Sequence, residues 1–169
     1  MLMKATLRTA ALATLLASTA LPVFATTLNW ARSSDVQTLD PHAYNHGVTN
    51  AFNHQIYEPL VARSDDGALV PVLATEWVNL TEDRTIWEVT LREGVTFHDG
   101  TPFEADDVAF SIERAQSDTS NMRGLVSSIA SVEVVDPLTV RIHTNGVNPI
   151  LFNNLIGYLA THGKDEIAF

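Results

Sequence analysis

Cysteine is absent from this chain of 169 residues, and basic residues are scarce. Without cysteine the chain has no disulfide framework, no Cys-ligated zinc, no iron–sulfur cluster and no thiol catalysis. Ten Lys+Arg stand against twenty Asp+Glu, which gives a formal net charge of −10. Because phosphate contacts need lysine and arginine, this balance argues against nucleic acid or an anionic membrane surface as partner. A hydrophobic content of 46% excludes wholesale disorder.

A long hydrophobic run is also lacking, because the apolar stretch at residues 9–21 is shorter than the ~20 residues that span a bilayer. Lys4 and Arg8 precede this stretch, and a proline follows it. Small residues then occupy the −3 and −1 positions before a cleavage site between Ala25 and Thr26. This order is typical of a secretory signal peptide. We therefore expect residues 1–25 to be removed on export.

The remaining sequence predicts short helices and strands that are interleaved, so the fold class is mixed α+β or α/β. Trp87, Val89 and Leu91 alternate with polar residues, which is the two-residue period of a half-buried strand. Val108, Ile112 and Ala115 instead recur at helical spacing. Strands are predicted at residues 27–31, 60–62, 76–80, 85–92, 131–135 and 138–144, with a turn at 65–67. The strands at 76–80 and 85–92 are expected to pair antiparallel, and the last two strands to form a hairpin around Asp136-Pro137. Helices are predicted at 48–57, 105–115 and 122–130 and from Pro149, with an apolar stripe of Ile150, Leu151, Leu155, Ile156 and Leu159.

Several polar residues resemble parts of metal-binding or catalytic sites, but the rest of the sequence does not support such a site. His42, His46 and His54 lack the convergence that a metal site needs, and we interpret them as surface and helix-capping residues. The His-Asp-Gly run at 98–100 fits a tight turn, and Asp106-Asp107 fits a helix start. The sequence contains no glycine-rich phosphate loop and no His-Glu-x-x-His motif. We therefore expect neither an enzyme nor a cofactor.

The order of several motifs is more informative than any one of them. Asp40-Pro41-His42 comes first, and Tyr-Glu-Pro-Leu-Val follows at 57–61. A long block, Leu-Arg-Glu-Gly-Val-Thr-Phe-His-Asp-Gly-Thr-Pro, runs from 91 to 102 and leads into Ala-Asp-Asp-Val at 105–108. Together these motifs resemble the extracytoplasmic solute-binding proteins of peptide and nickel ABC transporters, solute-binding family 5. Glu104 departs from the family, which usually places Thr, Asn or Ser there, so a looser helix start is expected.

The resemblance implies part of a type II periplasmic binding protein, whose two lobes close on a ligand. Residues 1–25 would be the signal peptide, 26–60 the start of lobe I, and 61–169 the small subdomain typical of the peptide-binding cluster. Family members are much longer, and the second lobe would be absent. Residues implied to lie near the cleft are Ser33, Ser34, Asp35, Tyr44, Asn45 and His46.

The implied function is import of dipeptides or oligopeptides, with delivery of the ligand from the periplasm to a membrane permease. The full-length protein is expected to be a monomer. Nickel chelates and other small solutes are alternative ligands, and a non-functional truncated product is a further alternative. A small secreted hydrolase would need a nucleophile–base pair or a metal triad, which the sequence does not offer. Because a hinge-closing binder without one lobe cannot enclose a ligand, this chain by itself is predicted to bind peptide weakly or not at all.

Overall fold

Residues 31–32 and 34–156 are described by the computed structural model of the chain. Ser34 begins the unit that holds every described helix and strand. The predicted signal peptide and most of the predicted strand at 27–31 lie outside the described residues. None of the described helices is both long enough and apolar enough to cross a bilayer.

The main sheet has four antiparallel strands in the order β3-β4-β6-β5. They are β3 (Ala74–Asn79), β4 (Ile86–Leu91), β6 (Thr139–Thr144) and β5 (Ile129–Asp136). The predicted pairing of the strand at 76–80 with that at 85–92 is confirmed, as is the hairpin around Asp136-Pro137. One cross-strand row aligns Trp77, Val89, Val140 and Val134, and its two central members are fully buried, whereas Val134 on the edge strand β5 is 41% exposed.

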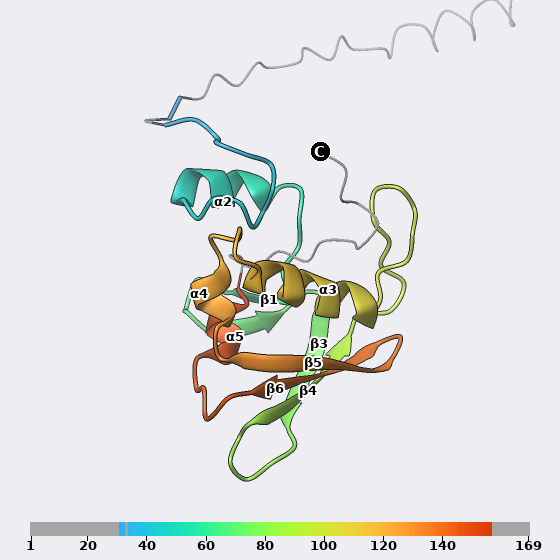
Figure 1. Ribbon diagram of the computed structural model, residues 1–169. Coiled ribbons are helices and arrows are strands. Elements are labelled where there is room, and N and C mark those ends of the chain that lie inside the picture. Colours follow the sequence, from blue (N-terminus) through green and yellow to red (C-terminus); the bar gives the residue numbers. More distant parts are fainter. Residues whose placement is uncertain (1–30, 33, 157–169) are drawn as a thin grey trace, which may run out of the picture. The chain divides into compact units, whose positions relative to one another are not determined.

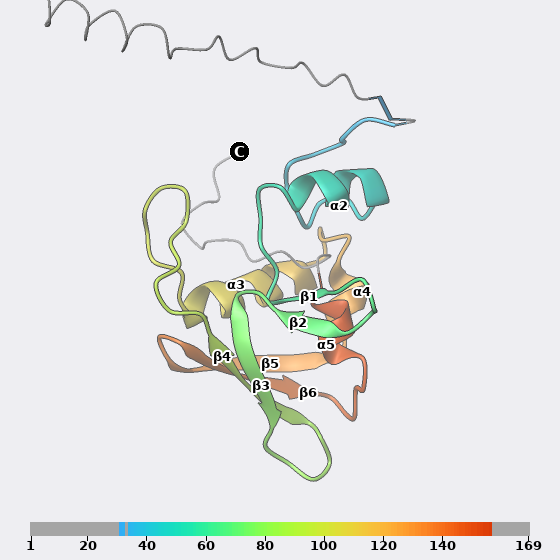
Figure 2. The same ribbon diagram turned by 180° about the vertical axis from the view of Figure 1, so that it is seen from behind.

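The hydrophobic core lies between this sheet face and α3 (Ala105–Gln116). Val89, Val140 and Ile142 are fully buried on the sheet side, while α3 contributes Val108 and Ile112. Figures 1 and 2 both show α3 running along the sheet beside β5. The alternating pattern in the sequence thus predicted the buried side of β4 correctly, and the helical spacing predicted the buried side of α3.

A smaller sheet and a short helix lie nearer the start of the described chain. β1 (Val61–Arg63) pairs antiparallel with β2 (Leu69–Pro71) across a turn in which Gly67 has a φ of +87°. The predicted strand and turn are confirmed here. Helix α2 covers Gly47–Asn53 and ends earlier than the predicted 48–57, because the chain forms a tighter turn after Asn53. Figure 2 shows β1 and β2 as a separate ribbon from the main sheet.

Two predicted helices are shorter in the structure because strand pairing ends or replaces them. Helix α4 is limited to Arg123–Val126, since Ile129 pairs with Thr144 and begins β5. Helix α5 covers Leu151–Asn154, and Ile156 instead bridges to Val61 in parallel. The predicted apolar stripe was therefore wrong in part: Leu151 and Leu155 are buried, but Ile150 is 54% exposed. Leu159 lies outside the described residues.

The start of α3 corrects another expectation, because Glu104 does not give a loose helix end. The Asp107 carboxylate accepts the Glu104 backbone N–H at 2.9 Å, and the two residues form a reciprocal capping box. This contact satisfies backbone donors that would otherwise lack partners at a helix start. Asp106 and Asp107 thus belong to helix-start chemistry, as the sequence predicted.

Replacing Asp107 by alanine is expected to lower the free energy of unfolding by about 1 kcal/mol, because the buried carboxylate caps the helix. The Asp106→Ala variant is the matched control: its carboxylate is exposed and stands outside the capping box. Urea unfolding of both variants measures the difference. Equal losses in the two variants would show that charge near the helix end, rather than the capping box, stabilises α3.

Candidate functional site

The loop before α2 carries two of the residues predicted to bind ligand. Ser34 and Asp35 are exposed, while Ser33 lies outside the described residues. The Asp35 carboxylate accepts the Val36 backbone N–H at 2.8 Å, and Thr49 Oγ1 accepts the Gln37 backbone N–H at 3.3 Å. The second bond ties the loop to α2 through Gln37.

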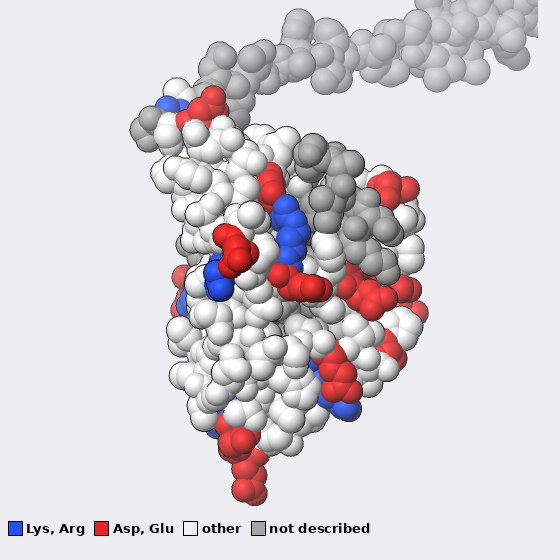
Figure 3. Space-filling model, viewed as in Figure 1, with Lys and Arg blue, Asp and Glu red and all other residues white. Residues whose placement is uncertain are grey.

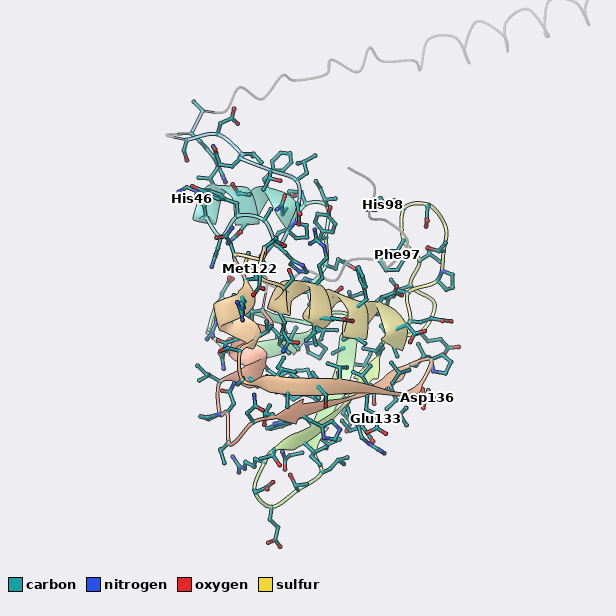
Figure 4. All side chains as sticks on the ribbon, viewed as in Figure 1. His46, Phe97, His98, Met122, Glu133 and Asp136 are labelled. Carbon is teal, nitrogen blue, oxygen red and sulfur yellow. The ribbon has the colours of Figure 1, made fainter. Side chains whose placement is uncertain are left out.

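The other three predicted residues form the entry to α2. Tyr44 and His46 are exposed, and their ring centroids lie 5.8 Å apart with planes tilted by 30°. Asn45 Oδ1 accepts a hydrogen bond from the Asn50 side-chain amide at 3.0 Å, which holds this turn against the helix. The structure therefore places a tyrosine and a histidine side by side at the surface, where rings with polar atoms can stack on a ligand and hydrogen-bond to it. Figure 4 shows His46 at α2.

An ion pair that the sequence analysis missed anchors this segment to α3. Arg114 donates from Nη1 and Nη2 to the two carboxylate oxygens of Asp40, at 2.8 and 2.6 Å. Both side chains are about three-quarters buried, with 23% and 29% exposed. This bidentate geometry is the strongest form of a carboxylate–guanidinium contact.

The pair also changes the titration of both groups. The hydrogen bonds from Arg114 lower the pKa of Asp40, burial opposes this, and the His42 backbone N–H lowers it further. The hydrogen bond to Asp40 raises the pKa of Arg114, also against burial. Both groups are therefore charged at neutral pH.

A third segment joins the site through the backbone of residues 42–43. In the loop between α3 and α4, the Asn121 backbone N–H donates to the His42 carbonyl at 2.9 Å. The Asn121 side chain donates to the Ala43 carbonyl. Beside these contacts lies a hollow of about 180 Å³, which Asp40, Arg114 and the hydroxyl residues Ser117, Thr119 and Ser120 help to line. In the sequence, the serine and threonine residues of this loop were the available sign that it lines a polar hollow.

Of the three histidines predicted to be surface and helix-capping residues, His46 and His54 are exposed and occupy the N-cap and C-cap positions of α2. His42 is 2% exposed, so its prediction as a surface residue was wrong. His46 occupies the N-cap position of α2, but its side chain makes no capping hydrogen bond. Within residues 31–32 and 34–156, no group of three His, Cys, Asp or Glu side chains is arranged to hold a metal ion.

The predicted tight turn at residues 98–100 is confirmed. The Asp99 carboxylate accepts the Thr101 backbone N–H at 2.9 Å and the Thr101 hydroxyl at 2.7 Å. Gly100 has a φ of +89°, which favours glycine. These hydrogen bonds lower the pKa of Asp99. The Asp99 carboxylate therefore stabilises the turn.

Acidic groups predominate on the described surface. Figure 3 shows more red than blue side chains on the visible face. On the exposed face of the main sheet, Arg141 contacts Glu88 at 2.9 Å and Glu133 at 3.6 Å, and His143 lies 3.3 Å from Glu133. The electrostatic field around the described surface thus favours neutral or cationic ligands over anionic ones.

Comparison with known proteins identifies the family. Residues 68–168 match the family described as bacterial extracellular solute-binding proteins, family 5 Middle. The chain belongs to this family. The resemblance inferred from the motifs is thereby confirmed, and the family is one of solute-binding proteins rather than of enzymes, as the sequence predicted.

Among curated relatives, the glutathione-binding protein GsiB of Salmonella paratyphi A is 35% identical over 111 residues, which cover 64% of this chain and 22% of that protein. The structure of NikA from Brucella suis in complex with Fe(III)-EDTA is 30% identical, with a TM-score of 0.70, and the likeness covers 80% of this chain and 28% of that one. NikZ from Campylobacter jejuni in complex with Ni(L-His) is 28% identical, with a TM-score of 0.66 and coverage of 75% and 25%. This family-5 chain therefore spans only 22–28% of the length of these relatives.

Proposed function

We propose that this chain is the N-terminal part of a substrate-binding protein that captures a peptide in the periplasm and delivers it to the permease of an ABC importer. The match of residues 68–168 to the family carries the proposal. The signal-peptide pattern of residues 1–25, with cleavage after Ala25, supports export. Among the relatives, GsiB is named for glutathione and NikZ was solved with Ni(L-His), which makes glutathione-like peptides and nickel chelates two candidate ligand classes.

In this proposal, residues 26–60 begin lobe I and residues 61–169 form its small subdomain. The distribution of buried residues supports a boundary near residue 60. From Leu60 to Leu155 the buried apolar side chains form one cluster. Among the described residues before Leu60, none belongs to this cluster.

The ligand surface in this proposal consists of Ser34 and Asp35 together with Tyr44, Asn45 and His46. The ring pair of Tyr44 and His46 offers stacking area, and the Asp35 carboxylate suits the ammonium group of a peptide. Asp40 and Arg114 hold the segment that carries this surface on α3. The opposing wall of the cleft would come from a second lobe, so we expect the 169-residue chain alone to bind peptide weakly or not at all.

Replacing Tyr44 by alanine is expected to weaken peptide binding about fivefold, because the exposed ring supplies contact area worth about 1 kcal/mol. The test is calorimetric titration of the protein purified from the periplasm of its own host with a dipeptide, glutathione and nickel–histidine. Phe52→Ala is the matched control, because Phe52 is also 42% exposed and lies on α2 of the same segment.

A dipeptide or glutathione that binds the native protein, with loss in the Tyr44 variant and little change in the Phe52 variant, supports the proposal. Binding of nickel–histidine alone would replace the peptide by a chelate as the ligand class. Equal losses in both variants would contradict the assignment of the ligand surface, and no binding across the panel would contradict the proposed function.

A further inference from the structure

A larger hollow lies apart from the proposed peptide-binding surface. It has a volume of about 350 Å³ and is bounded by residues 54–58, which follow α2, and by the hairpin at 95–103. This volume is within the range of small-molecule sites in proteins. Figure 4 shows Phe97 and His98 on that hairpin, well separated from His46. The hollow therefore shares no residue with the proposed peptide-binding surface.

The inner part of this hollow is apolar and aromatic. Tyr57, Leu73 and Phe103 line it and are themselves buried, with 8%, 4% and 3% exposed. Phe97 packs against Phe103 edge to face, with ring centroids 6.0 Å apart and planes at 81°. Two perpendicular rings present both a face and an edge to a flat ligand, and a ring face also attracts a cation.

The rim of the hollow is polar, and the fixed charge that it carries is negative. Glu58 is exposed and contributes the carboxylate, while His54, Gln55, Thr96 and His98 complete the rim. No lysine or arginine occurs among the described residues that line the hollow. An anion would therefore find no charged partner here and would also be repelled by a chain of net charge −10.

We propose that this hollow is a binding site for a small amphipathic amine. The apolar part of the ligand, preferably aromatic, lies against Phe97 and Phe103, and its ammonium group lies at the rim next to Glu58. The inference goes beyond the proposed function and does not depend on it, because neither the residues nor the ligand class involve the surface at Ser34–His46. A protein of this kind would carry a second ligand outside its peptide-binding surface.

The test is titration of the chain with phenethylamine and with phenylacetate, which have the same ring and nearly the same size but opposite charge. Chemical shifts of the Phe97 and Phe103 ring protons report binding at the hollow itself. We expect phenethylamine to bind in the millimolar range and phenylacetate to bind at least about tenfold more weakly.

Substitutions of two exposed carboxylates distinguish a contact at the rim of the hollow from an effect of the overall negative charge of the chain. Glu58→Gln is expected to weaken phenethylamine binding about fivefold, because the carboxylate at the rim is lost. Glu93→Gln removes the same charge from an exposed residue that does not line the hollow, and it is expected to leave binding unchanged.

The proposal is overturned if neither compound shifts the two rings, if both compounds bind equally well, or if the Glu58 and Glu93 variants lose the same affinity. The last result would assign any amine binding to the overall acidity of the chain. Each outcome is independent of peptide binding, so failure here leaves the proposed function standing.

Discussion

Replacing Ile142 by alanine is expected to lower the free energy of unfolding by about 3 kcal/mol, the largest effect of any substitution considered for this chain. Ile142 lies on β6 and has no solvent exposure. It pairs with Trp87 on one side and with Val132 on the other, so it is central to the buried face of the sheet. Its truncation removes apolar contacts and leaves a cavity between the sheet and α3, which the surrounding side chains fill only in part.

Ile150→Ala is the matched control, since the same side chain is removed from a position that is 54% exposed. It should change the free energy of unfolding by less than about 0.5 kcal/mol. Urea unfolding followed by tryptophan fluorescence measures both variants, because Trp77 and Trp87 pack against Phe152 near the core. Similar losses in the two variants would mean that the sheet face between β4 and β5 is not the core of the fold.

Replacing Asp40 by asparagine is expected to cost about 2 kcal/mol at neutral pH, between the values for exposed and for fully buried ion pairs. The substitution leaves the partly buried Arg114 guanidinium without its carboxylate partner. It also loosens the segment that carries Tyr44 and His46. Asp118→Asn is the control, because Asp118 pairs with Arg123 at 2.6 Å but is 91% exposed, and we expect no measurable loss there.

The contribution of Asp40 should also depend on pH in a defined direction. Because Arg114 lowers the pKa of Asp40 in the folded state, the stabilisation is fully present above the ordinary aspartate value of about 4. It is lost as the pH falls below that value and through the lowered one, where the folded protein must also protonate the group. The stability difference between the wild type and the Asp40 variant should therefore shrink in acid. A difference that grows as the pH falls would contradict the ion pair.

Local patterns in the sequence were sufficient to predict the elements whose partners are near in the chain. The strands at 76–80 and 85–92 are joined by a short turn, and their alternation determined both the pairing and the buried side. The helix at 105–115 was equally clear, because its apolar spacing and its acidic first turn agree. The end of α5 could not be predicted in this way, since it depends on Ile156 pairing with Val61 far away in the sequence.

In the candidate site, too, some residues could be indicated from the sequence, whereas contacts between residues far apart in the chain could not. The family resemblance indicated Ser34, Asp35 and the residues 44–46, and their role in binding stays a prediction; in the structure, Gln37 ties the first loop to α2, and Asn45 bonds to Asn50 of that helix. The ion pair between Asp40 and Arg114 was missed because the two residues are 74 positions apart and neither has an unusual local context. Burial of His42 was missed for a similar reason: its backbone carbonyl accepts hydrogen bonds from Ser120 and Asn121, which lie far away in the sequence in the α3–α4 loop.

The most direct test is native mass spectrometry of the protein released from the periplasm of its own host. Our account predicts a chain that begins at Thr26, has a mass several times the 18.5 kDa of this sequence, and carries a small solute that is lost on denaturation. A protein that retains residues 1–25, remains in the cytoplasm and carries no solute would contradict the assignment as an exported solute-binding protein. A surviving product with the mass of residues 26–169 alone would instead contradict transport, unless a partner supplies the second lobe.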